Sequence, residues 1–355
     1  MARTPTVDTR LHVNSPTPAS AIAHLFIGKR TTRRESHVHL SLYPLSLVPC
    51  PSVPPSLYPV PVPHVDAAVV LAALLALAPY FGAAFFPAHF VGHARRLVVW
   101  EQIALPALLA IPYVVVAVDA GDFYWRWVAV YALGPAAMAL ITRWFPRDDR
   151  AIWLQLAVLV LLGLSVDLRW FEGAWPAHLS VFNKVLLLDA GIYAFFILSP
   201  MAGTGFDLRL RWSDVATGLR EFLFYLPIAL TIGLLTGFLH VHAPGWNLLP
   251  LLAQFCEAWV FTFFFIAVPE ELFFRGWLEN LLERRAGRNA ALAITAVLFG
   301  LAHFNKRALH FNTRYVILAA LAGIFYGRAW RRRRRVAASA ITHATVDSVW
   351  SLLLK

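Results

Sequence analysis

The chain has 355 residues, of which 59% are hydrophobic and only 14% are charged, and its mean hydropathy is +0.61. Because soluble domains carry about a quarter charged residues, this composition excludes an ordinary soluble protein and indicates an integral membrane protein. Lysine and arginine outnumber the acidic residues by 31 to 20. No DNA- or RNA-binding pattern accompanies this excess, so we expect no nucleic-acid partner.

The first 65 residues differ from the rest of the chain. A polar, basic segment is followed by eight prolines within residues 41–64, a density that prevents a continuous helix. We expect 1–65 to be a disordered, Pro-rich basic tail, or an artefact of a start codon placed too early.

From residue 66 onward, apolar runs recur at the length of roughly 20 residues that a helix needs to cross a hydrocarbon layer of about 30 Å. They predict an all-α fold, a polytopic transmembrane helical bundle of about 8–10 spans. The N-terminal transmembrane helices, over 66–203, have a role that the sequence leaves open, and Lys184 and Asp189 among them are expected to pair locally. The expected spans lie near 66–91, 97–118, 124–143, 151–167, 184–203, 220–240, 249–268, 290–304, 314–330 and 337–354.

Loop charges predict an orientation. Basic loops alternate with loops that hold few basic residues, and the positive-inside rule places the basic set in the cytoplasm and both termini outside. The basic tail does not fit this orientation, nor do Lys306 and Arg307, which lie in a loop assigned to the outside. The arginine run 331–335 is expected at the cytoplasmic lipid head groups, where each charge gains about 1 kcal/mol from anionic lipid.

Two adjacent carboxylates, Glu270 and Glu271, interrupt the apolar segment WVFTFFFIAVPEELFFRGWLENLL. Charged groups at membrane depth are costly and mark chemistry or a transport path. Glu271 precedes Arg275 by four residues, the favourable order for an ion pair on a helix, and the guanidinium can hold that carboxylate with two donors. Glu270 is then the less compensated carboxylate, and its removal from water should make it a better proton acceptor than a solvated glutamate. The alternative is a purely structural cluster at a helix kink after Pro269.

Two histidines follow in apolar surroundings. His303 ends the run ALAITAVLFGLAH, and Phe299, one turn earlier, can pack against its imidazole. A lone histidine at a helix end is more often a cap, but beside Glu270 it would complete a general-base pair acting on one water.

His343 and Asp347 lie four residues apart in AITHATVDSVW, so both face the same way. Asp347 can fix the tautomer of His343, which could then donate to a developing oxyanion, or the two can simply shield each other from lipid.

These residues resemble the motifs of a known family. EELFFRG at 270–276 resembles the EExxxR signature of the CAAX-protease and bacteriocin-processing (CPBP, or ABI) intramembrane proteases. FGLAH at 299–303 resembles that family's FxxxH, and HATVD at 343–347 resembles its HxxxN/D. The three motifs occur in the family's order within hydrophobic segments. The resemblance covers about 220–355 and implies that residues 204–355 form a CPBP-like intramembrane protease core.

The resemblance implies a glutamic-type endopeptidase that hydrolyses a peptide bond of a membrane-associated protein or peptide. Carried over to this chain, Glu270 and His303 activate the attacking water, while His343 and Asp347 hold the carbonyl oxygen. An asparagine at this position of the motif would donate a hydrogen bond outright, whereas Asp347 can donate only when protonated. The alternative role of Asp347 is to orient His343. We expect no cofactor and no bound metal, a bacterial or archaeal cytoplasmic membrane as the location, and the lipid bilayer as a partner. The supporting residues are Glu271, Arg275 and Phe299.

Two other classes of function fit parts of the pattern. Glu270, His303 and His343 are a possible ligand set for a catalytic zinc ion, which would make the protein a metal-dependent membrane protease. The same side chains could form a proton relay in a transporter, or belong to a non-enzymatic membrane scaffold or immunity protein. No internal repeat of the transporter kind is visible, and the polar residues cluster in the last third of the chain. The sequence leaves open the substrate, its prenylation, the side from which it enters and the oligomeric state.

Overall fold

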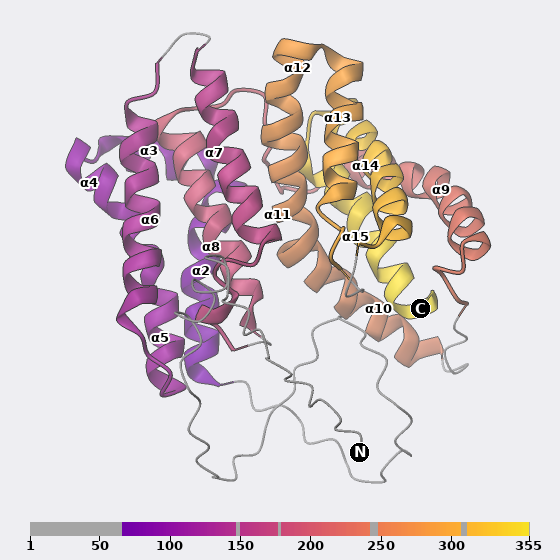
Figure 1. Ribbon diagram of the computed structural model, residues 1–355, viewed down its shortest axis with the longest axis horizontal. Coiled ribbons are helices and arrows are strands. Elements are labelled where there is room, and N and C mark those ends of the chain that lie inside the picture. Colours follow the sequence, from indigo (N-terminus) through magenta and orange to yellow (C-terminus); the bar gives the residue numbers. More distant parts are fainter. Residues whose placement is uncertain (1–65, 147–149, 177–178, 242–247, 307–310, 355) are drawn as a thin grey trace, which may run out of the picture. The chain divides into compact units, whose positions relative to one another are not determined.

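The computed structural model describes residues 66–354, apart from 147–149, 177–178, 242–247 and 307–310, and all of them lie within one compact unit. The expected tail, 1–65, lies outside the described residues. The described part is helical, and its only β-type pairing is an isolated bridge between Val241 and Leu354. The prediction of an all-α helical bundle is confirmed (Figure 1).

The first half of the described chain forms helices α2 to α8. α2 begins after Asp66, whose carboxylate accepts a hydrogen bond from the N–H of Ala68 at 3.0 Å and so caps the helix. α2 packs against α5 and α8, and several buried aromatic side chains belong to the hydrophobic core between these helices. The bounds are α2 Ala67–Phe85, α3 Pro87–Arg96, α4 Val99–Ala104, η1 Leu105–Ala110, α5 Ile111–Asp119, α6 Trp125–Arg143, α7 Arg150–Asp167, η2 Glu172–Ala174, α8 Val181–Ile192 and η4 Tyr193–Leu198.

The second half forms helices α9 to α15. The helix that carries the carboxylate pair continues past both residues, without a break from α10 to the end of α12. α14 begins after Asn312, whose side chain accepts from the N–H of Tyr315 at 3.2 Å. The bounds are α9 Trp212–Leu235, α10 Leu248–Thr262, η5 Phe263–Ala267, α11 Val268–Glu271, η6 Leu272–Glu279, α12 Asn280–Ala286, α13 Arg288–Leu301, α14 Thr313–Arg333 and α15 Val336–Leu353.

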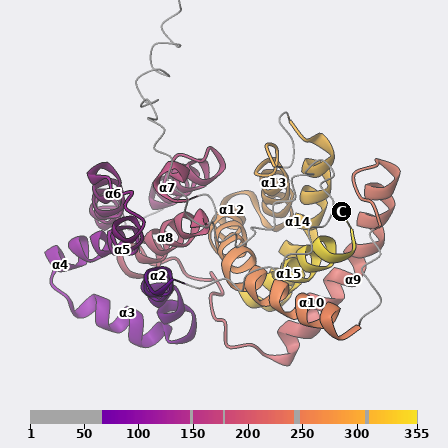
Figure 2. The ribbon, with the colours of Figure 1, turned by 90° about the horizontal axis from the view of Figure 1, so that it is seen from below.

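The last helix, α15, lies among α9, α10 and α14 (Figure 2). Its first ten residues, 336–345, are all buried. The main hydrophobic core extends from there into the N-terminal helices, where Trp277 stacks obliquely on Phe195 with ring centroids 5.3 Å apart. The N-terminal helices and the expected protease core therefore share one packed interior.

Six of the described helical segments are long and apolar enough to cross a membrane, against the eight to ten spans expected. α13 is apolar but has only 14 residues. α15 is not among the six: it carries His343 and Asp347, and its neighbours rather than lipid surround it. Helices enclosed in this way need not be apolar along their whole surface. The structure supports an integral membrane protein, while the orientation inferred from loop charges stays a prediction.

Candidate active site

The helix that carries Glu270 changes its winding on both sides of this residue. Wider, π-type turns occupy Phe263–Ala267 and Leu272–Glu279, with α11 between them. Pro269 lies in α11, and because it has no N–H it cannot donate to the preceding turn, which interrupts the regular hydrogen-bond pattern. π-type turns of this kind occur frequently at functional sites. The carboxylate pair thus lies where the backbone departs from the ordinary α-helix.

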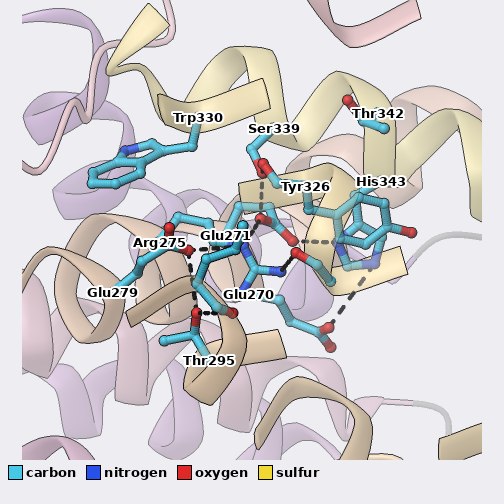
Figure 3. Close-up of polar contacts among 12 residues, drawn as sticks. Glu270, Glu271, Arg275, Glu279, Thr295, Tyr326, Trp330, Ser339, Thr342 and His343 are labelled. Atoms are coloured by element: carbon cyan, nitrogen blue, oxygen red, sulfur yellow. Dashed lines mark hydrogen bonds and ion pairs between the residues drawn. The ribbon is translucent and has the colours of Figure 1, made fainter. Parts of the chain in front are cut away.

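Glu271 is completely buried and is held by three side chains (Figure 3). Its Oε2 lies 3.2 Å from Nε of Arg275 and accepts a hydrogen bond from Oγ of Ser339. Its Oε1 lies 2.9 Å from Nδ1 of His343. The predicted ion pair between Glu271 and Arg275 is confirmed. The contact with His343 is a finding that sequence reasoning missed, because 72 residues separate the two partners.

His343 lies among three carboxylates. Its Nδ1 faces Glu271, while its Nε2 lies 3.4 Å from Oδ2 of Asp347 and 4.0 Å from Oε2 of Glu270. A carboxylate accepts hydrogen bonds, so the 2.9 Å contact assigns a proton to Nδ1. The expected proximity of His343 and Asp347 is present. Glu271 lies at Nδ1 and Asp347 at the other ring nitrogen, so carboxylates face both nitrogens of His343, and a role of Asp347 in setting the tautomer stays a prediction.

Glu270 is compensated by two lysines. Nζ of Lys184, on α8, lies 3.5 Å from Oε1, and Nζ of Lys306, in the loop after α13, lies 4.0 Å from the same oxygen. These contacts are longer than those of Glu271 with Arg275 and His343, so Glu270 is paired and is still the less tightly compensated carboxylate. The predicted pairing of Lys184 with Asp189 is wrong: Lys184 pairs with Glu270, and the buried carboxylate of Asp189 has no hydrogen-bond partner among the described residues.

His303 is buried just beyond the end of α13. Its Nδ1 lies 2.8 Å from the carbonyl oxygen of Phe299, so this nitrogen donates and Nε2 keeps its lone pair. Phe299 packs against His303 with ring centroids 4.9 Å apart and against His343 at 5.6 Å. Within the described part of the chain no hydrogen bond joins His303 to Glu270. The predicted contact between Phe299 and His303 is confirmed, and this aromatic ring is what links the two histidines.

Residues 252–349 match the family model of the type II CAAX prenyl endopeptidases, described as Rce1-like. The matching model is that of a CPBP-type family, and the matched segment is similar to its members. The match includes Glu270, His303, His343 and Asp347, so it bears out the resemblance seen in the three motifs and suggests a membrane CAAX protease. Searches among curated proteins and among solved structures gave no match.

Within this Rce1-like segment, the carboxylate pair continues into a series of buried ion pairs. The Arg275 guanidinium lies 5.2 Å from the ring centre of Phe299, and its Nη2 donates to the carbonyl oxygen of Gly323 at 3.1 Å. Glu279, one helical turn further, accepts from Oγ1 of Thr295 at 3.2 Å and lies 2.5 Å from Nε of Arg331. Glu279 is completely buried, and its spacing of four residues from Arg275 is the sequence signal that could have identified it.

The arginine run 331–335, at the end of α14, is partly buried. Arg331 pairs with Glu279, and Arg335 lies 2.9 Å from Asp214 and 2.7 Å from Asp207. Arg334, with φ of +50°, ends α14 in the left-handed conformation and turns the chain into α15. The expectation that all five arginines lie at lipid head groups is wrong for Arg331 and Arg335. The side chain of Arg331 pairs with the buried Glu279, and that of Arg335 joins the Rce1-like segment to the start of α9.

The residues that could bind a metal ion do not come together. In the ranges that the structure describes, no group of three or more His, Cys, Asp or Glu side chains is arranged to hold a metal. Glu270, His303 and His343 accordingly do not form the zinc ligand set considered from the sequence. The arrangement in the Rce1-like segment is instead a histidine, His343, that the carboxylates of Glu270, Glu271 and Asp347 face from different sides.

Proposed function

We propose that the protein is a glutamic-type intramembrane endopeptidase that hydrolyses a peptide bond of a membrane-associated protein or peptide. The observation that carries this proposal is the 4.0 Å separation between Oε2 of Glu270 and Nε2 of His343. That distance is too long for a direct hydrogen bond, and one bridging water can span it. The match to the type II CAAX prenyl endopeptidases supports the same activity.

Glu270 is the proposed general base. Its carboxylate takes a proton from the water as the oxygen attacks the carbonyl carbon of the scissile peptide bond. His303 supports this step through Nε2, the ring nitrogen that the contact with Phe299 leaves free to accept. The same proton then passes from Glu270 to the leaving nitrogen, and the C–N bond breaks to give a carboxylic acid and an amine. The second proton of the water stays on the new carboxyl group and then passes to the amine, so the products are a carboxylate and an ammonium group and Glu270 is again ionised.

His343 is the proposed oxyanion-binding residue, and Asp347 is its proposed positioning partner. The Nδ1–H group of His343 points at Glu271, so Nε2 is directed toward Glu270 and Asp347. Neighbouring carboxylates favour the imidazolium, whose Nε2–H group can donate to the oxyanion of the tetrahedral intermediate. An ionised Asp347 cannot donate. Its proposed role is to accept from His343 and hold the ring until the substrate carbonyl arrives.

The other roles follow from buried contacts. Glu271 orients His343, and Arg275 neutralises Glu271 from the opposite side. Phe299 separates the two imidazoles from the surrounding helices and limits their movement. A bacterial or archaeal cytoplasmic membrane remains our proposed location, and the substrate's prenylation is left to experiment.

The test compares the full-length protein with its Glu270→Gln variant in membranes. Glutamine keeps the shape of the side chain but cannot accept the proton, so we expect cleavage to fall at least 1,000-fold while the protein still folds. A fluorogenic farnesylated CAAX peptide and comparative membrane proteomics provide the two readouts. The matched control is Glu257→Gln, because Glu257 is an exposed glutamate on the preceding turns of the same helix. Full cleavage activity of Glu270→Gln would refute Glu270 as the base. Absence of cleavage by the wild type would favour a scaffold, and loss of wild-type activity on metal chelation would favour the zinc mechanism.

A further inference from the structure

The two oxygens of Glu270 face different partners. Oε2 is directed toward His343, whereas Oε1 lies within 4.0 Å of the ammonium groups of Lys184 and Lys306. Figure 3 shows the Glu270 side chain reaching toward the His343 ring. The lysines thus hold the oxygen that the proposed reaction does not use. A carboxylate held at one oxygen can rotate less, so the other oxygen stays aimed at the water site.

Lys184 comes from a part of the chain outside the Rce1-like segment. It lies on α8, and the family match begins at residue 252. α8 nevertheless contacts α11, the short helix that carries Glu270. Phe195 and Trp277 pack together close by, where the helix that continues α8 meets η6. The fold therefore brings a cation from the N-terminal helices to the carboxylate that the family motif supplies.

The backbone position of Lys184 is fixed by its buried neighbour. Asn183 accepts a hydrogen bond from the hydroxyl group of Tyr131 at 3.1 Å, and that hydroxyl accepts from Nε1 of Trp175 at 2.7 Å. Asn183 is buried, whereas the side chain of Lys184 is 33% exposed. The ammonium group can therefore keep part of its hydration while its stem is anchored. This arrangement presents the charge at a defined point instead of on a freely moving side chain.

We propose that Lys184 is a positioning residue of the active site: together with Lys306 it holds Oε1 of Glu270 and keeps Oε2 directed at His343, so the N-terminal helices complete the catalytic centre. This inference rests on the proposed role of Glu270 as the base. It assigns a function to α8, a helix that lies outside the family motifs. It also gives a reason why the Rce1-like segment, residues 252–349, is attached to further helices with which it shares a hydrophobic core.

The experiment uses the purified full-length protein in lipid nanodiscs and the farnesylated CAAX peptide as probe. Lys184→Met removes the charge at similar length, Lys184→Arg keeps it, and Arg332→Met removes an exposed charge elsewhere as the control. We expect Lys184→Met to lower kcat about 10- to 100-fold with less than a twofold change in KM. We also expect the acid limb of its pH–rate profile to move up by about 1 pH unit, because an opposite charge next to the base is lost. Lys184→Arg should recover most of kcat and the wild-type profile.

Each outcome decides the inference. A Lys184→Met variant with the kcat and pH profile of the wild type would overturn it. A rise in KM of more than tenfold, with kcat and profile unchanged, would also overturn it and assign Lys184 to substrate binding. If Lys184→Met does not purify as a folded protein, Lys184→Gln takes its place under the same criteria. Failure of the proposed function has a different signature, since Glu270→Gln would then remain active whatever Lys184 does.

Discussion

Replacement of Glu271 by glutamine tests whether this residue, and not Asp347, orients His343. The substitution keeps the size of the side chain and removes its charge. In the wild type the carboxylate lies 2.9 Å from Nδ1 of His343 and 3.2 Å from Nε of Arg275, and all three side chains are buried. Glutamine can still accept one hydrogen bond through its amide oxygen. It cannot serve both cationic partners, so either the histidine or the arginine loses its acceptor.

The expected magnitudes follow from these contacts. Breaking a buried ion pair costs about 3–5 kcal/mol, and because Glu279 remains 3.9 Å from Arg275 we expect the lower end, about 3 kcal/mol. At about 2–4 °C per kcal/mol, the melting temperature should fall by roughly 6–12 °C. For catalysis we expect kcat to fall about 100-fold, equivalent to about 2.7 kcal/mol of transition-state stabilisation.

The assay measures melting temperature and peptide cleavage of Glu271→Gln in nanodiscs beside Glu257→Gln as the exposed control. A variant that melts within 2 °C of the wild type and keeps at least a third of its kcat would refute the reasoning, because Glu271 would then neither balance Arg275 nor orient His343. A large loss of stability with normal kcat would refute only the orienting role. The control should match the wild type in both measurements, since Glu257 is exposed.

Two further predictions concern aspartates. Asp347→Asn should keep at least a third of the wild-type kcat, because the amide oxygen can still accept from Nε2 of His343. The kcat of Asp347→Ala should fall more than tenfold. Equal activities of the two variants would contradict the orienting role. Asp207 lies in the loop before α9, outside the membrane-spanning segments. Partial burial alone would raise the pKa of its carboxyl group, but hydrogen bonds from Arg209 and Arg335 hold this pKa below its ordinary value. Since a lowered folded-state pKa stabilises the protein above the unfolded value of about 3.9, this stability should disappear as the pH falls below about 4, and Asp207→Asn should show a smaller loss of melting temperature over that range.

The local part of the site could be predicted because it depends on helical spacing. Glu271 and Arg275, like His343 and Asp347, are four residues apart, and such a spacing places both side chains on one face wherever the helix lies. The packing of Phe299 on His303 follows from the same rule. In the same way, long apolar runs are sufficient to predict a helical membrane protein. Such runs have too few polar side chains to form a water-exposed surface, and within lipid a helix satisfies its own backbone hydrogen bonds.

The chain by itself determined the helices, their apolar character and the short-range pairs, since each of these depends on residues within one or two turns. Only the tertiary structure decided which partner each charge has. Lys184 approaches Glu270 across 86 positions, Glu271 reaches His343 across 72, and Arg335 pairs with Asp214 across 121. The reason is physical: a buried charge takes whichever counter-charge the packing of helices brings within about 4 Å, and sequence separation does not limit that choice.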